Sequence, residues 1–338
     1  MKKAVITGPR QAALVEVPDP QPKDDWVVVK VHAAPLCTDY KAFCAGSKCD
    51  HMGHEAAGEV VAVARPGCVQ VGDRVVVMPQ TPCGQCALCR AGDYIHCQSC
   101  YDFAAVHGTR EGSGTLAQML LKLDWLLPKI PDGVSYEHAS LACCGLGPSF
   151  GAMQAMGTSA FDTILITGLG PVGLGAIVNA SYRGARIIAV EASPWRVQRA
   201  HDMGVEHVLD PRDEATLPRV MELTGGRGVD CALDCSGVVP AERLCIDAAR
   251  RKGQVAFIGE CFEPLPITVS NDMIRKGLTI RGSWHYNLCD FPRIMQIIQR
   301  SPLIELLISH VMPMSRLQEA LELCATHETA KVVLRPWE

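Results

Sequence analysis

The stretch Thr163-Ile-Leu-Ile-Thr-Gly-Leu-Gly-Pro-Val-Gly173 decides the fold of the second half of the chain. Its first five residues form an apolar, β-branched run that predicts a buried strand. A G-x-G-x-x-G turn follows directly and opens an apolar helical stretch. The first glycine permits the tight turn, the second lets the backbone approach a pyrophosphate, and the third allows the helix to pack closely on the strand. The residues expected to contact a dinucleotide here, at the N-terminus of the helix, are Gly168, Gly170, Pro171, Val172 and Gly173.

Glu191 gives the turn its specificity. It ends the next predicted strand, Ile187–Val190, 18 residues after Gly173. A carboxylate at this point can accept hydrogen bonds from a ribose and would repel a 2′-phosphate. We therefore expect NAD as the cofactor. NADP stays open as an alternative because Arg196 and Arg199 lie close by in the sequence.

Outward from this turn, strand and helix patterns alternate, which predicts a parallel, doubly wound sheet. The further strands are expected at Val205–Leu209, Val229–Asp234 and Gln254–Ile258. The first half instead shows short β-branched runs between turns, which predicts a mostly antiparallel β domain. These runs are Trp26–His32, Gly58–Val63 and Val75–Val77. The tail adds a helical stretch, Leu317–Leu323, and a strand, Lys331–Leu334.

Length and composition set the class of protein. The 338 residues are enough for two domains at roughly 100–200 residues each. A net charge of −4 without a block of like charges indicates neither a nucleic-acid partner nor a membrane surface. We find no apolar run near the ~18 residues of a spanning helix and no signal peptide. The 17 cysteines are an odd number, so reduced thiols in a cytoplasmic protein are expected.

Four of these cysteines form a C-x2-C-x2-C-x7-C pattern within fifteen residues. Thiols spaced in this way on a tight loop can surround one ion at about 2.3 Å, the geometry of a closed four-cysteine zinc site. A closed site leaves no position for a substrate, so we expect a structural zinc ion here. Its ligands are Cys83, Cys86, Cys89 and Cys97.

The chain resembles the zinc-containing medium-chain alcohol dehydrogenases, including the sorbitol and threonine dehydrogenase branches, over nearly its whole length. The most specific features are the GHExxG block at Gly53–Gly58, the four-cysteine run, and the glycine turn with Glu191. Gly112–Ala117 and Ser309–Pro313 resemble two further segments of the family. The resemblance implies a GroES-like catalytic domain over residues 1–146 with a zinc lobe at 83–97. It also implies a Rossmann domain over 147–285 and a return to the catalytic domain over 286–338.

The resemblance also implies an activity. It is zinc-dependent hydride transfer between a secondary alcohol, polyol or sugar-like, and NAD, with two zinc ions per chain, in a homodimer or homotetramer. An alternative within the family is an L-threonine or aminocyclitol-type dehydrogenase. An alternative of another class is a non-catalytic relative that keeps the zinc and nucleotide sites.

The family's site residues map onto this sequence with some departures. Two thiols and one imidazole would hold catalytic zinc and leave its fourth position open. Glu55 would lie behind the ion or act as an alternative ligand. Cys143 competes with its neighbour for the third position, and either Thr38 or Asp39 could relay the substrate proton because Cys37-Thr38-Asp39 is one residue shorter than the family pattern. An alternative role for Asp39 is to orient His54. The zinc ligands implied are Cys37, His54 and Cys144; Arg196 would lie near the adenosine ribose, Lys331 near the pyrophosphate, and Trp284, His285 and Tyr286 near the substrate.

Overall fold

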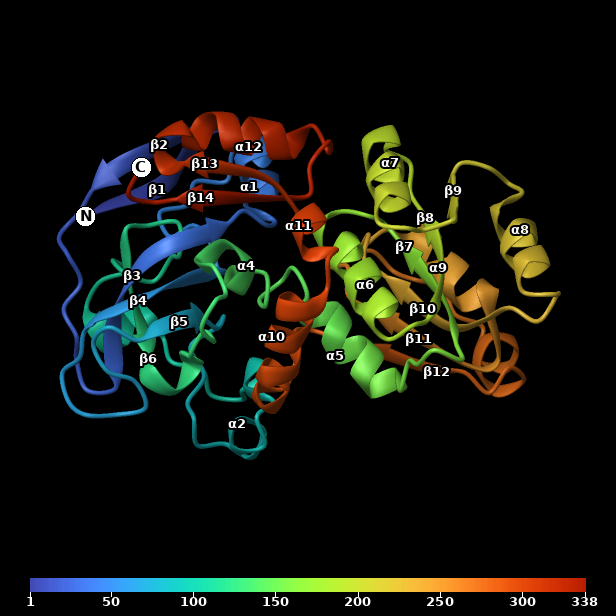
Figure 1. Cartoon of the computed structure of the whole chain (residues 1–338), viewed down its shortest axis with the longest axis horizontal. Coiled ribbons are helices and arrows are strands. Elements are labelled where there is room, and N and C mark those ends of the chain that lie inside the picture. The colour runs from blue at the N-terminus through green and yellow to red at the C-terminus, as the bar shows by residue number, and fades with distance from the viewer. The chain divides into compact units, whose positions relative to one another are not determined.

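The computed structural model describes all residues from 1 to 338 and divides into two compact units. Unit 1 comprises Met1–Cys144, Asn287–Arg300 and Ile308–Glu338, and unit 2 comprises Gly145–Tyr286 and Ser301–Leu307. The late part of the chain therefore returns to unit 1 in two separate segments (Figure 1).

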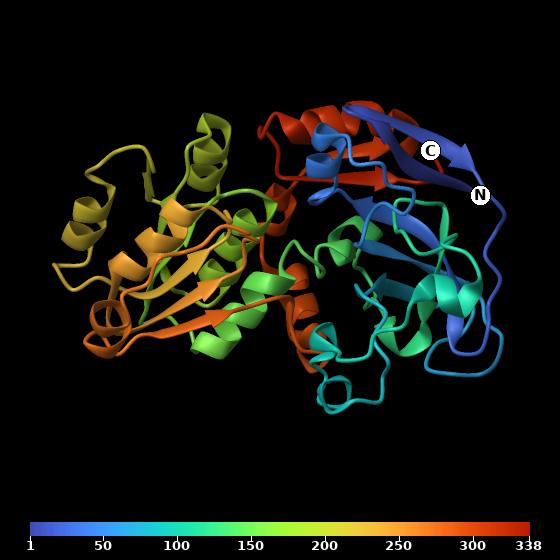
Figure 2. The same cartoon turned by 180° about the vertical axis from the view of Figure 1, so that it is seen from behind.

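Unit 2 is built on one parallel sheet with the strand order β12-β11-β10-β7-β8-β9. The order reverses at β7, so successive crossovers put helices on both faces of the sheet (Figures 1 and 2). Its strands are β7 (Thr163–Thr167), β8 (Arg186–Val190), β9 (His207–Leu209), β10 (Val229–Asp234), β11 (Ala249–Phe257) and β12 (Thr279–Gly282). Its helices are α5 (Gly147–Met156), α6 (Pro171–Tyr182), α7 (Pro194–Asp202), α8 (Thr216–Leu223), α9 (Val239–Ala248), the π-helical turn Val269–Ile274 and α11 (Ile304–Leu307).

The prediction of a parallel, doubly wound sheet is confirmed, and the reason lies in the strand patterns. Every residue of β7 and β10 is buried, as expected for strands covered by helices on both faces. The strand expected at Val205–Leu209 is shorter than predicted and begins at His207.

Unit 1 is mostly antiparallel β structure. One sheet has the order β13-β14-β3-β4-β5, with β6 pairing β3, and β1 and β2 form a separate hairpin. The strands are β1 (Lys2–Gly8), β2 (Gln11–Glu16), β3 (Trp26–Pro35), β4 (Ala56–Ala62), β5 (Arg74–Val77), β6 (Met119–Leu123), β13 (Ile308–Pro313) and β14 (Lys331–Arg335). The α-helices are α1 (Asp39–Ala45), α2 (Ala87–Arg90), α3 (Phe103–His107), α4 (Tyr136–Ser140), α10 (Phe291–Arg300) and α12 (Leu317–Ala325). Single 3₁₀ turns lie at Tyr94–His96, Asp124–Leu126, Leu288–Asp290 and Met314–Arg316.

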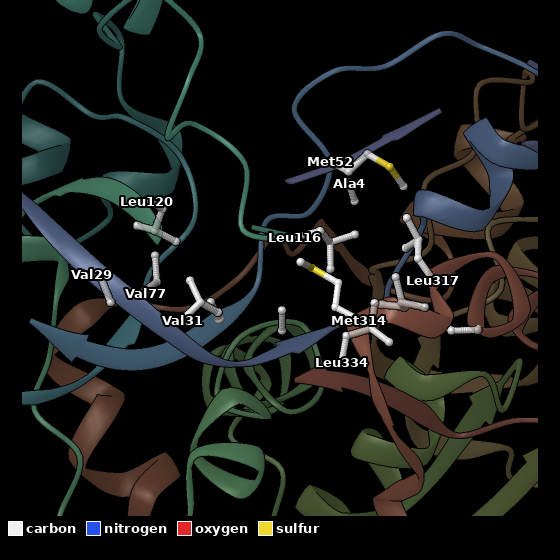
Figure 3. Close-up of a cluster of buried hydrophobic side chains, with 14 of the residues drawn as sticks. Ala4, Val29, Val31, Met52, Val77, Leu116, Leu120, Met314, Leu317 and Leu334 are labelled. Atoms are coloured by element: carbon white, nitrogen blue, oxygen red, sulfur yellow. The ribbon is translucent and has the colours of Figure 1, made fainter. Parts of the chain in front are cut away.

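The core of unit 1 joins the beginning and the end of the chain. Val29 and Val31 of β3 and Val77 of β5 share one apolar cluster with Leu317 of α12 and Leu334 of β14 (Figure 3). The tail is therefore part of this unit's core, and β14 is held against β3. None of the helices combines the length and the apolar character needed to cross a bilayer.

Candidate metal centres and cofactor turn

The first candidate centre is the lobe formed by residues 83–97. The thiols of its four cysteines lie within 4.8 Å of one another, while Cys100 is exposed and lies outside the group. Backbone N–H groups point at the sulfurs: that of Cys86 donates to Cys83 Sγ at 3.4 Å, and that of Cys89 donates to Cys86 Sγ at 3.5 Å. The bond from Cys89 N–H lowers the pKa of Cys86 to about 6. Four thiols gathered in this way, with backbone N–H groups directed at their sulfurs, suit a closed zinc site.

The second candidate centre brings together residues that are far apart in the sequence. Donor atoms of Cys37, His54, Glu55 and Cys144 all lie within 4.8 Å of one another. Cys37 follows β3 and His54 precedes β4. These strands are antiparallel neighbours, with Ala33 paired to Ala57, so the end of one lies beside the start of the other.

Asp39 ties these two ligand-bearing segments together. Its Oδ2 accepts from the Cys37 N–H at 3.2 Å, and its Oδ1 accepts from the Gly53 N–H at 2.9 Å. The carboxylate therefore fixes the spacing between Cys37 and the residue that precedes His54. Thr38 stands at the start of α1, and its side chain does not cap that helix.

Glu55 is held from two sides in the interior of unit 1. One carboxylate oxygen accepts from Lys331 Nζ, and the other accepts from the Cys144 N–H at 3.0 Å. Both side chains of the ion pair have no exposed surface. Although burial opposes the charge of Lys331, the negative groups Cys37 and Glu55 raise its pKa, so the ammonium keeps its proton. The structure thus places Lys331 behind the metal group; its contact with a pyrophosphate stays a prediction.

The two neighbouring cysteines after α4 have different surroundings. Cys143 is buried and its thiol donates to the carbonyl of Val77 at 3.4 Å. Cys144 joins the metal group instead. Its thiol donates to Cys37, and this bond holds the pKa of Cys37 well below that of an ordinary thiol. Although burial opposes its charge, the neighbouring Cys37 raises the pKa of His54 to about 9.

In unit 2, the glycine turn has the shape that its sequence predicts. Gly168 has φ +78°, and a Cβ there would lie 2.6 Å from Ser236 Cβ. A Cβ on Gly173 would lie 1.9 Å from the carbonyl oxygen of Gly168, so helix α6 can approach the turn only without a side chain. Gly170 is the N-terminal cap residue of α6, and Pro171 and Val172 begin the helix.

Glu191 and Arg196 complete this turn. One Glu191 oxygen accepts from the Leu169 N–H at 2.6 Å, and the other accepts from the N–H groups of Ala192 and Ser193 at 2.8 and 2.9 Å. The guanidinium of Arg196 lies 3.7 Å from the place that a Cβ on Gly170 would occupy, and its Nε is buried with no protein acceptor. A bare backbone surface beside a guanidinium with one unpaired N–H suits a phosphate-bearing ligand.

Comparison with known proteins agrees with this geometry. Residues 23–132 match the model of the alcohol dehydrogenase GroES-like domain, and residues 171–300 match that of the zinc-binding dehydrogenases. The chain is 33% identical to L-threonine 3-dehydrogenase of Pyrococcus horikoshii over 95% of this chain and 94% of that protein. The chain belongs to the zinc-containing medium-chain alcohol dehydrogenase family. It is also 32% identical to sorbitol dehydrogenase of Bacillus subtilis, over 77% of this chain and 75% of that protein. Among solved structures, alcohol dehydrogenase TADH from Thermus sp. ATN1 superposes with a TM-score of 0.88 at 26% identity, covering 99% of each chain.

Family membership confirms the predicted fold class and indicates that zinc is the metal to consider at the two centres. This enzyme is an oxidoreductase with a GroES-like unit and a Rossmann unit, and its family implies binding of zinc and of NAD(P). The residues fit both groups. Cysteine and histidine donors suit zinc in both metal centres, and the bare turn with Glu191 suits a dinucleotide.

The three residues that we expect near the substrate lie at the end of the first segment of unit 2, Gly145–Tyr286. His285 and Tyr286 are buried with their rings stacked 4.9 Å apart, and Trp284 keeps 48% of its surface exposed. Their contact with a substrate stays a prediction. What the sequence did not reveal is the pairing of Glu55 with Lys331, because 276 residues separate them and neither lies in a spacing motif.

Proposed function

We propose that this enzyme transfers hydride between a secondary alcohol of the polyol or sugar class and NAD, with catalytic zinc held by Cys37, His54 and Cys144. The observation that carries this proposal is the engagement of Glu55. Glu55 is committed to Lys331 and to the Cys144 N–H, so we assign the ion to Cys37, His54 and Cys144, which leaves one of its four positions open.

The surrounding residues have separate tasks in this proposal. Bound zinc supplies Lewis acidity that lowers the pKa of an alcohol, and the nicotinamide supplies the hydride acceptor. Asp39 holds the Cys37 and His54 segments at a fixed spacing. The hydroxyl of Thr38, directly after Cys37, is the group we assign to relaying the alcohol proton, because it can accept that proton while its own proton passes on to solvent. Asp39 is assigned to holding the backbone, since each of its oxygens accepts from a backbone N–H. The four cysteines of the lobe hold the second zinc ion, which stabilises that loop.

The preference for NAD rests on Glu191. Its carboxylate is fixed by three backbone N–H groups at the edge of the glycine turn. A fixed negative charge there repels a 2′-phosphate, while its remaining lone pairs can accept from ribose hydroxyls. Arg196, beside Gly170, is assigned to the adenosine ribose. Lys331 is assigned to the support of Glu55 in place of the pyrophosphate contact, because its side chain is fully buried in that ion pair.

A second candidate substrate is L-threonine, because the threonine dehydrogenase relative aligns over more of this chain than the sorbitol dehydrogenase relative does. A screen of NAD reduction over sorbitol, other polyols, sugars and L-threonine separates the two. We expect the highest kcat/KM with a polyol or sugar alcohol. Turnover confined to L-threonine would refute the polyol assignment.

Metal analysis separates an enzyme from a non-catalytic relative. We expect two zinc ions per chain, and we expect Cys37→Ala to lose one ion and all turnover while the folded protein still binds NADH. One zinc ion in the unaltered chain, with no turnover on any alcohol, would favour the non-catalytic alternative. Unchanged activity in Cys37→Ala would refute the catalytic assignment.

We further propose a cytoplasmic homodimer or homotetramer. Strand β12 (Thr279–Gly282) is the end strand of the unit 2 sheet, and its free edge can pair with a second copy. Light scattering of the purified protein tests the oligomeric state, and a monomer at micromolar concentration would refute it.

A further inference from the structure

The four-cysteine lobe is tied to a segment that follows it by almost two hundred residues. Asn287 is the first residue of the segment Asn287–Arg300 that returns to unit 1. Its Nδ2 donates to the carbonyl of Ala91 at 2.8 Å and to Asp93 Oδ1 at 3.1 Å. The N–H of Leu288 donates to the carbonyl of Gly92 at 3.1 Å. Three consecutive lobe residues, which lie between Cys89 and Cys97, therefore accept from two consecutive residues of the return segment.

The same asparagine also begins the helical part of the return segment. Its Oδ1 accepts from the Cys289 N–H at 3.1 Å and caps the 3₁₀ turn Leu288–Asp290, which runs into α10. Asparagine suits both tasks because its amide offers two donors and one acceptor. Gly92 completes the fit. It has φ +88°, and a Cβ there would lie 2.2 Å from Asn287 Oδ1, so the lobe presents bare backbone to this side chain.

The lobe has little apolar core with which to keep this shape. Of its fifteen residues, Cys89, Tyr94 and Ile95 are the buried ones. A loop of this size depends on a cross-link, and four thiols around one ion supply it. Without the ion, the acceptors at positions 91–93 would no longer be held at the spacing that Asn287 requires.

We propose that Asn287 is a latch through which the metal of the four-cysteine lobe holds the return segment Asn287–Arg300 in place. This inference rests on the proposed metal content of the lobe. The coupling is reciprocal: the metal protects the return segment from local opening, and the latched segment slows loss of the metal.

The latch links the lobe to the catalytic group within unit 1. Helix α10 buries Phe291, Ile294 and Ile298, among others, and contacts α4. The chain reaches Cys144 four residues after α4 ends. A metal ion that touches no substrate thus supports, through Asn287 and α10, the segment that carries a ligand of the other ion.

Asn287→Ala in the zinc-loaded full chain tests the latch, with Cys289→Ser as the control. The control changes an exposed side chain in the same turn and leaves every backbone bond of the latch intact. Loss of two donated bonds and one accepted bond should speed amide exchange across residues 288–300 about 30-fold, equivalent to about 2 kcal/mol at 1.4 kcal/mol per tenfold. Cys289→Ser should exchange like the unaltered chain.

Asn287→Asp separates the latch from the helix cap. Aspartate keeps the acceptor for the Cys289 N–H but loses both donors and faces the carboxylate of Asp93. We expect it to speed exchange as much as Asn287→Ala does, and this variant also serves if the alanine variant does not fold.

Metal release gives the reciprocal test. In a Cys37→Ser background the lobe holds the remaining zinc, and its transfer to a chromogenic chelator should be about tenfold faster with Asn287→Asp. Removal of that zinc from the Cys37→Ser chain should speed amide exchange of residues 288–300. In the double variant that also carries Asn287→Asp, removal of the zinc should change this exchange less than threefold. Equal exchange and equal metal release in Asn287→Asp and its parent would overturn the latch. A lobe that holds no zinc would instead overturn the proposed metal content, so the two failures are distinguishable.

Discussion

Asp39→Asn tests how the catalytic metal group is assembled. The native carboxylate accepts one hydrogen bond from the N–H of Cys37 and one from the N–H of Gly53. Asparagine keeps one acceptor oxygen and turns its NH₂ group towards the second N–H. The substitution therefore removes one hydrogen bond and creates a contact between two donors, while the size of the side chain is unchanged.

The expected cost follows from these two contacts. A hydrogen bond to a charged acceptor contributes about 1.5–3 kcal/mol. We expect zinc binding at the catalytic group to lose about 2 kcal/mol, which is about 30-fold in affinity. This value lies within the roughly 10–100-fold effect of removing a group that supports metal ligands.

The assay is competition for zinc with a chromogenic chelator, which resolves the two ions of each chain. The lobe zinc is the internal control, because Asp39 makes no bond to the lobe. Thr38→Val is the matched variant at the neighbouring position. It should keep both ions and lose turnover, since it removes the hydroxyl that we assign to relaying the alcohol proton. Catalytic zinc affinity in Asp39→Asn within threefold of the unaltered chain would refute the reasoning, and so would equal weakening at both sites.

Three further predictions concern the cofactor, the third ligand and a buried charge. Glu191→Gln should weaken NAD binding at least tenfold and improve the relative affinity for NADP, measured by fluorescence titration; an unchanged NAD/NADP ratio would remove Glu191 from its role. Cys144→Ser should lose the catalytic zinc and Cys143→Ser should keep it, as read by metal content, and the reverse result would exchange their assignments. Lys122 is buried without an ion pair, and burial lowers its pKa to about 7. Because the folded chain then binds fewer protons than the unfolded chain between pH 7 and about 10.5, its stability should rise with pH in that window. Lys122→Met should therefore raise the unfolding free energy by about 2 kcal/mol at pH 7 and by less at pH 9, whereas exposed Lys41→Met should change it little; a gain that is independent of pH would contradict this.

Much of the fold could be predicted because its signals are local. A buried strand, a glycine turn and a helix follow one another without a break in Thr163–Tyr182, so one short window contains the elements that form the turn. The four cysteines of the lobe lie within fifteen residues and can meet with little help from the rest of the chain. Glu191 was predicted from its position at the end of the next strand along the chain, and the parallel pairing of β7 with β8 brings it to the turn.

The second metal group, by contrast, could be predicted from the sequence only through family resemblance. Nothing in the spacing of Cys37, His54 and Cys144 brings them together. The antiparallel pairing of β3 and β4 joins the first two, and the direction of the chain after α4 turns the thiol of Cys144 into the group while that of Cys143 points to Val77.

The sequence by itself therefore determined a two-part chain with a dinucleotide turn and a four-cysteine lobe, because those features need only neighbours along the chain. The family resemblance pointed to Cys144, and the tertiary structure brought its thiol into the second metal group. The tertiary structure alone decided that Lys331 pairs with Glu55 and that Asn287 binds the lobe. Each of these contacts depends on strands and segments that meet only after the chain has folded. Their energies come from burial and fixed geometry, which residue spacing does not encode.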